Sequence, residues 1–539
     1  MSEKFKTRWK LLTLALLGAT CASSVTLADH DDGEENGSHA KNIILFVGDG
    51  MGVSTVTATR IFSVGVDGQL VMDQMPFTAL SRTYTPDHIT PDSAGTMSAM
   101  MTGVNTNSGI IGLDATTERG DFNNDGDGMA PWTLLEMAKH QGMKVGVVTT
   151  ARVTHATPAA CYAHINERNH ETDIALQSLP TDQSYNWRLE GGLDVLMGGG
   201  RRFFVPAGTT DEEGESGSRS DGRDLRVEFQ NAGYTYVWNQ NQFNTLTGQD
   251  LPVLGLFDRS HMKWEYDRPL DVGGEPSLSE MTQKAVDLLQ NASNNDEGYF
   301  LMVESGRIDH AHHAGNAFRA MVDTENFDQA IGAVLSQVDL ENTLVIVTAD
   351  HSHVFSLAGY PMVAASKLPY APKSVPTEYA NAPFDGILNT VFNINNAGDV
   401  FEAADRDGVP YTILGYVNGP GYRDSARTNP RFDSFPGLDG NVPSSTNDPE
   451  YRQEAAVPRS SETHAGEEVA IYAVGPQSFQ FHGTVKNTRI FEVMRNALEL
   501  NQNFPAQSGN LFHNRSRNAR LFNALQQLER QTDSDHFED

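Results

Sequence analysis

The chain is poor in cysteine and in basic residues, and both shortages exclude whole classes of function. Only Cys21 and Cys161 occur among 539 residues, so a site built from several thiolates is excluded by number. Basic residues number 39 against 70 acidic ones, which gives a formal net charge of −31. Such a surface repels DNA, RNA and anionic membranes, so we expect none of these as partners.

Residues 1–28 have the pattern of an export signal. A basic start precedes the short apolar run Leu11–Ala19, and small residues continue to Ala28 before an acidic stretch. We therefore expect cleavage after Ala28 and a periplasmic or secreted protein, with Cys161 left as the single thiol. A lipoprotein anchor at Cys21 is the alternative, although the preceding Gly18-Ala19-Thr20 fits that signal poorly. No later run is long and apolar enough to span a membrane.

The acidic composition also suggests the solvent in which the chain works. It contains 11 lysines and 28 arginines against the 70 acidic residues. High external salt would screen the self-repulsion of such a surface, which is typical of salt-adapted (halophilic) proteins. The alternative is an acidic secreted enzyme without salt adaptation.

Short apolar, β-rich runs alternate with amphipathic segments along most of the chain. The expected strands are Asn42–Val47, Lys144–Thr149, Tyr299–Val303, Leu344–Thr348 and Glu468–Val474, and the expected helices are Pro131–Gln141, Ser277–Gln290 and Ala317–Gln337. This alternation predicts an α/β fold with a large, mostly parallel central sheet and helices on both faces.

Two stretches interrupt the alternation and set the expected domain boundaries. Residues 206–224 are acidic and rich in Gly and Ser, which indicates a surface loop. Residues 356–460 have little periodicity but contain apolar segments, which predicts an inserted subdomain. The core then comprises 29–355 and 461–503, and 504–539 form a polar tail.

Potential metal ligands follow four of the expected strands, where an open α/β sheet binds its ligands. Asp49, Glu304 and Asp350-His351 each lie at such a strand end, and the stretch Ala151–Thr157 follows the fourth strand. Asp309 and His313 are four residues apart on one helical face, a suitable spacing for two ligands of one Zn²⁺. Any one of these residues alone is more often a cap or turn residue, but several strand ends together indicate one shared site.

Ser93 is the candidate nucleophile. It lies in Thr90-Pro91-Asp92-Ser93-Ala94-Gly95-Thr96, before the helical run Met97–Thr102. A serine at a helix N-terminus can present its oxygen where backbone N–H groups favour a phosphate. A simple Asp or Ser helix cap is the usual alternative. Arg168 could grip two phosphate oxygens through its planar guanidinium, although an isolated arginine is most often a solvated surface residue.

Taken together, the motifs resemble those of the alkaline phosphatase family, in that family's order and over about residues 40–500. They are Val47–Gly52, Asp92–Ala94, Thr154–Ala160, Glu304–His310, Thr348–His353 and Glu462–Gly466. His155, His310 and the stretch Tyr411–Tyr422 resemble the animal-type branch. Met97 and Ser98 stand where the family more often has other small residues and Thr.

The resemblance implies three adjacent metal ions. The implied ligands are Asp309, His313 and His464 for one Zn²⁺, Asp49, Asp350 and His351 with Ser93 for a second Zn²⁺, and Asp49, Thr157 and Glu304 for Mg²⁺. His155 would lie just outside the magnesium ligands and His310 near the cluster, both tuning the metals without binding them.

A calcium site is also implied by the animal-type branch. Its ligands would be Glu213, the Phe257 carbonyl, Asp258 and Glu275, two of which differ by one methylene from the family pattern. The separate stretch Asp121–Gly126 echoes the start of a calcium loop, but it has Trp132 where that loop needs Glu, so we interpret it as an acidic turn.

The implied activity is hydrolysis of phosphate monoesters through a phosphoserine intermediate, with a broad range of leaving groups and an alkaline optimum. Ser93 would attack phosphorus, Arg168 would neutralise the phosphoryl oxygens, and Asp92 would orient Arg168. The family also implies a homodimer, to which a crown-like 356–460 insertion would contribute. The alternatives are a phosphodiesterase or sulfatase of the same superfamily, or a non-catalytic secreted protein that binds divalent cations.

Overall fold

The computed structural model describes residues 39–122, 128–293, 297–361, 386–395, 397, 399–423, 428–430, 435–500 and 502–508. The predicted signal, residues 1–28, lies outside these ranges, as do most of the predicted tail and most of the Asp121–Gly126 turn. The predicted domain boundaries therefore stay predictions.

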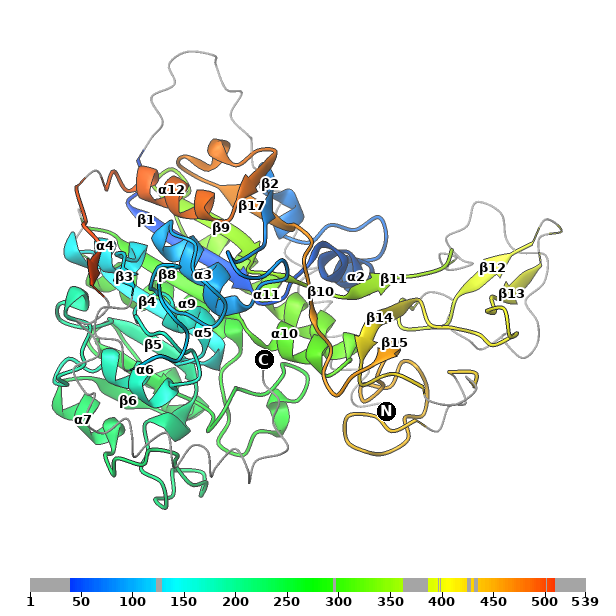
Figure 1. Ribbon diagram of the computed structural model, residues 1–539, viewed down its shortest axis with the longest axis horizontal. Helices are drawn as coiled ribbons and strands as arrows, with labels where there is room; N and C mark the ends of the chain where they lie inside the picture. Colours follow the sequence, from blue (N-terminus) through cyan, green and yellow to red (C-terminus); the bar gives the residue numbers. More distant parts are fainter. Residues whose placement is uncertain are drawn as a thin grey trace, which may run out of the picture. The chain divides into compact units, whose positions relative to one another are not determined.

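A ten-stranded sheet organises the described chain, in the order β18-β2-β17-β9-β1-β8-β4-β5-β7-β6 (Figure 1). Its strands are β1 (Asn42–Gly48), β2 (Phe77–Arg82), β4 (Lys144–Arg152), β5 (Val195–Gly199), β6 (Thr235–Val237), β7 (Val253–Leu256), β8 (Tyr299–Ser305), β9 (Thr343–Ala349), β17 (Val469–Val474) and β18 (Thr484–Lys486). All pairs are parallel except those of β17, which runs antiparallel to both β2 and β9. The predicted mostly parallel sheet is confirmed, and its five expected strands are all present.

Helices surround this sheet. They are α2 (Val53–Val64), α3 (Ser93–Thr102), α4 (Leu134–His140), α5 (Ala156–Ala159), α6 (Glu171–Gln177), α7 (Leu225–Asn231), α8 (Gln240–Thr245), α9 (Leu278–Ala292), α10 (Arg307–His313), α11 (Ala317–Gln337) and α12 (Thr488–Ala497). At the start of α9, the Ser277 hydroxyl accepts a hydrogen bond from the Glu280 backbone N–H, and the Glu280 carboxylate accepts one from the Ser277 backbone N–H. This capping box fixes where the helix begins. No helix within the described ranges has the length and apolarity needed to cross a bilayer.

The alternation of β1 side chains divides the core into two clusters. Ile43, Leu45 and Val47 pack with apolar residues of α3, α4 and α12. Ile44 and Phe46 pack with residues of α2, α9 and α11. Because successive side chains of a strand point to opposite faces, a fully buried strand such as β1 requires a helical layer on each side.

Smaller sheets lie outside the large one. The strands are β11 (Phe355–Leu357), β14 (Leu414–Gly419) and β15 (Glu454–Pro458) in one sheet, β12 (Phe392–Ile394) with β13 (Val400–Glu402), β10 (Ser352–His353) with β16 (His464–Ala465), and β3 (Met129–Ala130) with β19 (Gln507–Ser508). Phe355, Leu414 and Tyr416 share an apolar cluster with residues of α2 and α11. The described part of the predicted insertion is thus packed against the core helices.

Candidate active site

Three neighbouring strands bring the predicted metal ligands to one edge of the sheet. β8, β1 and β9 are parallel, and Gly48 at the end of β1 pairs with Ser305 and Ala349. Asp49 and Asp350 therefore follow the ends of two adjacent strands. Glu304, the second-to-last residue of β8, lies beside them. These carboxylates are all buried, and they lie together at one edge of the sheet, as expected from the sequence.

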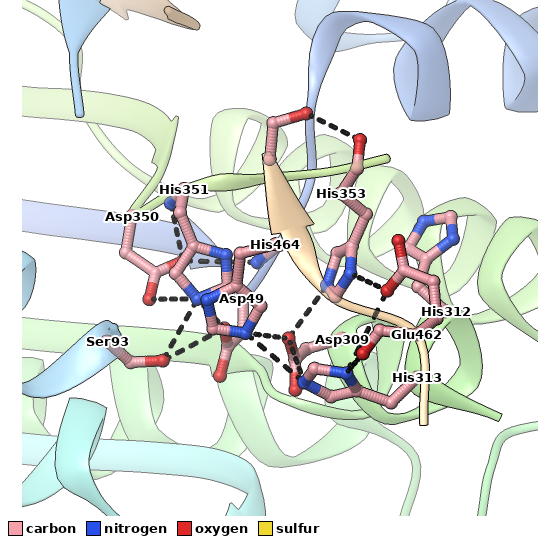
Figure 2. Close-up of polar contacts among 12 residues, drawn as sticks. Asp49, Ser93, Asp309, His312, His313, Asp350, His351, His353, Glu462 and His464 are labelled. Atoms are coloured by element: carbon pink, nitrogen blue, oxygen red, sulfur yellow. Dashed lines mark hydrogen bonds and ion pairs between the residues drawn. The ribbon is translucent and has the colours of Figure 1, made fainter. Parts of the chain in front are cut away.

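Asp309, His313 and His464, the predicted ligands of one Zn²⁺, lie together as a first group (Figure 2). Asp309 Oδ1 lies 3.3 Å from His313 Nε2 and 3.4 Å from His464 Nε2, and the two nitrogens are 3.2 Å apart. Ligand atoms at about 2.0–2.1 Å around a tetrahedral Zn²⁺ are roughly 3.3 Å from one another. The three atoms thus have the spacing of three corners of a zinc site.

Backbone carbonyls hold both histidines in the form that such a site needs. His313 Nδ1 lies 2.6 Å from the Glu462 carbonyl oxygen, and His464 Nδ1 lies 2.8 Å from that of Pro91. Since a carbonyl oxygen only accepts, each Nδ1 must carry the proton and donate it. Each Nε2 then keeps its lone pair for a metal ion.

His353 joins this group, although the sequence reasoning gave it no role. Its Nε2 lies 2.7 Å from Asp309 Oδ1 and its Nδ1 lies 2.5 Å from Glu462 Oε2. Burial disfavours its charged form, but the carboxylates of Glu462 and Asp309 outweigh burial and raise the pKa of His353 to about 10. The available signal was its position two residues after His351, on the same side of an extended segment.

Asp49, Asp350, His351 and Ser93 form the second group. His351 Nε2 lies 3.3 Å from Asp49 Oδ1 and 3.4 Å from Asp350 Oδ2. Ser93 Oγ lies 3.1 Å from the same nitrogen and 3.4 Å from Asp49 Oδ1. These separations again match the edges of a tetrahedral zinc site, with the serine oxygen at one corner (Figure 2).

A third group of oxygen atoms lies next to the second. Asp49 Oδ2, Thr157 Oγ1 and Glu304 Oε1 are buried and have no hydrogen-bond partner among the residues that the structure describes. Two carboxylates and a hydroxyl without partners suit Mg²⁺, which prefers oxygen ligands. A ring nitrogen of His155 lies within 4.8 Å of carboxylate oxygens of Asp49 and Glu304.

The electrostatics of these groups call for cations. Burial, together with the charges of Asp350, Asp309 and Glu304, holds the pKa of Asp49 well above its ordinary value. Burial also raises the pKa of Glu304 to about 8. Several buried carboxylates this close together are stable as anions only beside positive charge, which bound metal ions would supply.

Ser93 and Arg168 are held by the same aspartate. Ser93 is the first residue of α3, and the side chain of its cap, Asp92, accepts a hydrogen bond from Gly95 N. Asp92 Oδ2 accepts from Arg168 Nη1 at 2.9 Å and from Gly109 N at 2.9 Å. Burial works against charge on both side chains, but their mutual attraction lowers the pKa of Asp92 and raises that of Arg168. Asp92 thus connects the helix that carries the serine to the guanidinium.

His155 lies beside Arg168 and groups with His310 and with a histidine that the sequence reasoning missed, His261. His155 Nε2 lies 3.1 Å from Arg168 Nη2. The rings of His261 and His310 have centroids 4.0 Å apart, and nitrogens of all three histidines lie within 4.8 Å of one another. His261 follows β7 by a short loop and had no sequence signal of its own.

A group of carboxylates lies at the implied calcium site. Asp258 and Glu275 lie close to each other, and Asp271, which was not predicted, completes their group. Glu213 forms an ion pair with Arg201, and the charges of Asp271 and Asp258 also act on its carboxylate. Phe257, whose carbonyl was the remaining predicted ligand, is buried directly before Asp258.

Comparisons with known proteins agree with this geometry. The sequence model of the family described as Alkaline phosphatase matches residues 40–500. Alkaline phosphatase of Gadus morhua is 36% identical over 501 residues, which cover 87% of this chain and 94% of the cod protein. The tissue-nonspecific alkaline phosphatase isozyme of Homo sapiens is 36% identical over 485 residues, which cover 85% of this chain and 84% of the human protein.

Solved structures give the same result for the fold. Alkaline phosphatase of Thermus thermophilus has a TM-score of 0.58 at 25% identity and covers 90% of this chain and 96% of its own. Alkaline phosphatase from the Antarctic bacterium TAB5 has a TM-score of 0.56 at 23% identity, and the match covers 86% of this chain and 100% of the TAB5 chain. The motifs, the grouped ligands and the match over most of the chain lead to one assignment: this chain belongs to the alkaline phosphatase family of enzymes.

Proposed function

We propose that the chain hydrolyses phosphate monoesters to an alcohol and inorganic phosphate, through a phosphoserine formed on Ser93. The observation that carries the proposal is the position of Ser93 Oγ, 3.1 Å from His351 Nε2 at one corner of a zinc-like ligand set. Arg168 is connected to the same helix N-terminus through Asp92. A non-catalytic cation-binding protein would have no need for a serine and an arginine at these places.

The donor sets fit the implied metals. Asp309, His313 and His464 would hold one Zn²⁺, and Asp49, Asp350, His351 and Ser93 would hold the second; Asp49, Thr157 and Glu304 would hold Mg²⁺. When bound, these ions supply positive charge that favours deprotonated oxygen nucleophiles and stabilises charge on the leaving oxygen.

The chain's own residues then position the reacting groups. The Ser93 oxygen attacks phosphorus as its hydroxyl proton passes to solvent water. The bond from phosphorus to the ester oxygen breaks, and that oxygen takes a proton from water and leaves as the alcohol. A water molecule then attacks the phosphorus of the phosphoserine, the bond between Ser93 Oγ and phosphorus breaks, Ser93 Oγ takes back a proton, and inorganic phosphate leaves. Arg168 donates hydrogen bonds to the phosphoryl oxygens, and Asp92 keeps its guanidinium plane in place. Since these contacts go to the phosphoryl group, we expect a broad range of leaving groups and, because the nucleophiles must be deprotonated, an alkaline optimum.

The remaining expectations belong to the same proposal. We propose export by the 1–28 segment to the periplasm or the exterior, adaptation to salt, and a homodimer to which residues 356–460 contribute. We also propose a divalent-cation site, filled by Ca²⁺, at Asp258, Asp271 and Glu275. Two of its carboxylate oxygens, Asp271 Oδ2 and Glu275 Oε2, are buried with no hydrogen-bond partner in the described part of the chain, which suits an oxygen-ligated ion.

The test is Ser93→Ala, with Ser98→Ala on the same helix as the matched control. Ser93→Ala should retain its metals but lose p-nitrophenyl phosphate hydrolysis by at least about 10³-fold, because the nucleophile is gone. Acid quenching of the unsubstituted enzyme with substrate should trap phosphate on the peptide that contains Ser93. Unchanged turnover in Ser93→Ala would refute the proposal. Faster hydrolysis of a diester or a sulfate ester than of the monoester would favour the phosphodiesterase or sulfatase alternative.

A further inference from the structure

A lysine, Lys263, lies at the proposed calcium site. The site's carboxylates come from the loop between β7 and α9, with Asp258 just after the strand and Glu275 just before the cap of the helix. Asp258 is 6% exposed and Glu275 is 2% exposed, and the Asp271 side chain is 4% exposed. One oxygen atom from each lies within 4.8 Å of the others.

Lys263 contacts all three of these carboxylates. Its Nζ lies 2.6 Å from Asp258 Oδ2 and 3.8 Å from Asp271 Oδ1. Its backbone N–H donates to Glu275 Oε1 at 2.7 Å. The ammonium therefore lies among oxygen atoms that a divalent cation would need as ligands.

The lysine is nevertheless able to leave. Its side chain is 44% exposed, so the ammonium reaches the carboxylates from the solvent side. The four-carbon stem is flexible, and a strongly hydrated ammonium loses little when it turns outward into water. The three carboxylates, in contrast, are fixed in the loop.

The charge balance favours a second cation over the lysine alone. Three carboxylates face one ammonium, and the nearby Arg201 is engaged with Asp211 and Glu213. A divalent ion would complete the neutralisation, but it would repel an ammonium that stayed in contact with the same oxygens.

We infer that Lys263 is a tethered competitor for the divalent cation: its ammonium occupies the site when Ca²⁺ is absent and must swing out when Ca²⁺ binds. This inference rests on the cation site proposed above. It makes Lys263 the residue that sets the calcium affinity and that holds the loop together at low calcium. The folding of this loop would then depend less on calcium than the carboxylates alone would require.

The experiment measures Ca²⁺ binding by calorimetry, with the whole enzyme saturated beforehand with Zn²⁺ and Mg²⁺. Lys263→Gln removes the ammonium but keeps the backbone N–H to Glu275 and most of the side-chain length. Lys486→Gln, at an exposed position on β18, removes the same charge elsewhere. Glu275→Gln weakens the site itself and identifies the heat that belongs to it.

We expect Lys263→Gln to bind Ca²⁺ about tenfold more tightly than the unsubstituted enzyme. The substitution removes both the attraction of the ammonium to the carboxylates and its repulsion of the calcium ion. Lys486→Gln should bind like the unsubstituted enzyme. Without calcium, Lys263→Gln should melt at a lower temperature than the unsubstituted enzyme, and added Ca²⁺ should raise its Tm by more.

Two results would overturn the inference, and they differ in what else they refute. Equal Ca²⁺ affinity in Lys263→Gln and the unsubstituted enzyme, with binding lost in Glu275→Gln, would refute competition and leave the cation site standing. No calcium heat that responds to Glu275→Gln would refute the site together with the competition. Neither result bears on Ser93, because binding heat and melting are measured without phosphate ester.

Discussion

Replacing Arg168 is the sharpest test of how the site handles a phosphoryl group. Its guanidinium is 7% exposed, with Nη1 bound to Asp92 and Nη2 next to His155. A guanidinium has five N–H donors, so donors remain for phosphate oxygens after these contacts. Arg168→Ala should therefore weaken both the binding of inorganic phosphate and the stabilisation of the transition state.

The magnitude follows from the contacts that are lost. Two hydrogen bonds to a charged group, at about 1.5–3 kcal/mol each, amount to about 3–6 kcal/mol, or roughly 10²- to 10⁴-fold in kcat/KM. Arg168→Lys keeps the charge but not the planar fork, so its loss should be smaller, about tenfold. The turnover number kcat should fall less than kcat/KM wherever phosphate release limits the rate, because the product is also held less tightly.

The assay is steady-state hydrolysis of p-nitrophenyl phosphate, with inorganic phosphate as a competitive inhibitor. Arg489→Ala, at a half-buried position on α12, is the matched control and should change neither constant. Asp92→Asn separates positioning from capping, because asparagine still caps α3 but attracts Arg168 less. If Asp92 acts through Arg168, then Asp92→Asn should have no further effect on phosphate inhibition in the Arg168→Ala background. Phosphate inhibition that is unchanged in Arg168→Ala would refute the reasoning.

Two further predictions concern metal retention and salt. His353→Ala should lose zinc about 10- to 100-fold more readily than the unsubstituted enzyme, because His353 holds Asp309 in place through its 2.7 Å contact. Metal analysis after dialysis against a chelator checks this, and equal zinc retention in the two proteins would contradict it. The melting temperature should rise between about 0.1 M and 1 M NaCl, as the screening length falls from about 10 Å to about 3 Å and the repulsion within a chain of charge −31 weakens. An equal rise in an uncharged osmolyte of matched osmolarity would refute the electrostatic explanation.

Much of the fold was predictable because the sheet is made from locally recognisable pieces. Apolar runs such as Asn42–Val47 are buried on both faces, and so their hydrophobicity marks them without any tertiary information. The polar residues that follow them were recognisable for the same reason, since strand ends of a parallel sheet define the ligand-binding edge. The spacing of Asp309 and His313 likewise follows from helix geometry alone.

The pairing of charged groups across the fold was not predictable from the sequence. His353 and His464 are brought opposite each other by the β10–β16 pair, which joins segments more than a hundred residues apart. Glu213 forms an ion pair with Arg201, and Lys263 forms one with Asp258. In each pair, the packing of the chain brings the two opposite charges next to each other. The sequence by itself determined which side chains are of the types that bind metal and phosphate, and that several of them follow strand ends. Only the tertiary structure decided which of them meet, because a difference of a few ångströms in a buried site decides whether a carboxylate faces a cation, a histidine or a lysine.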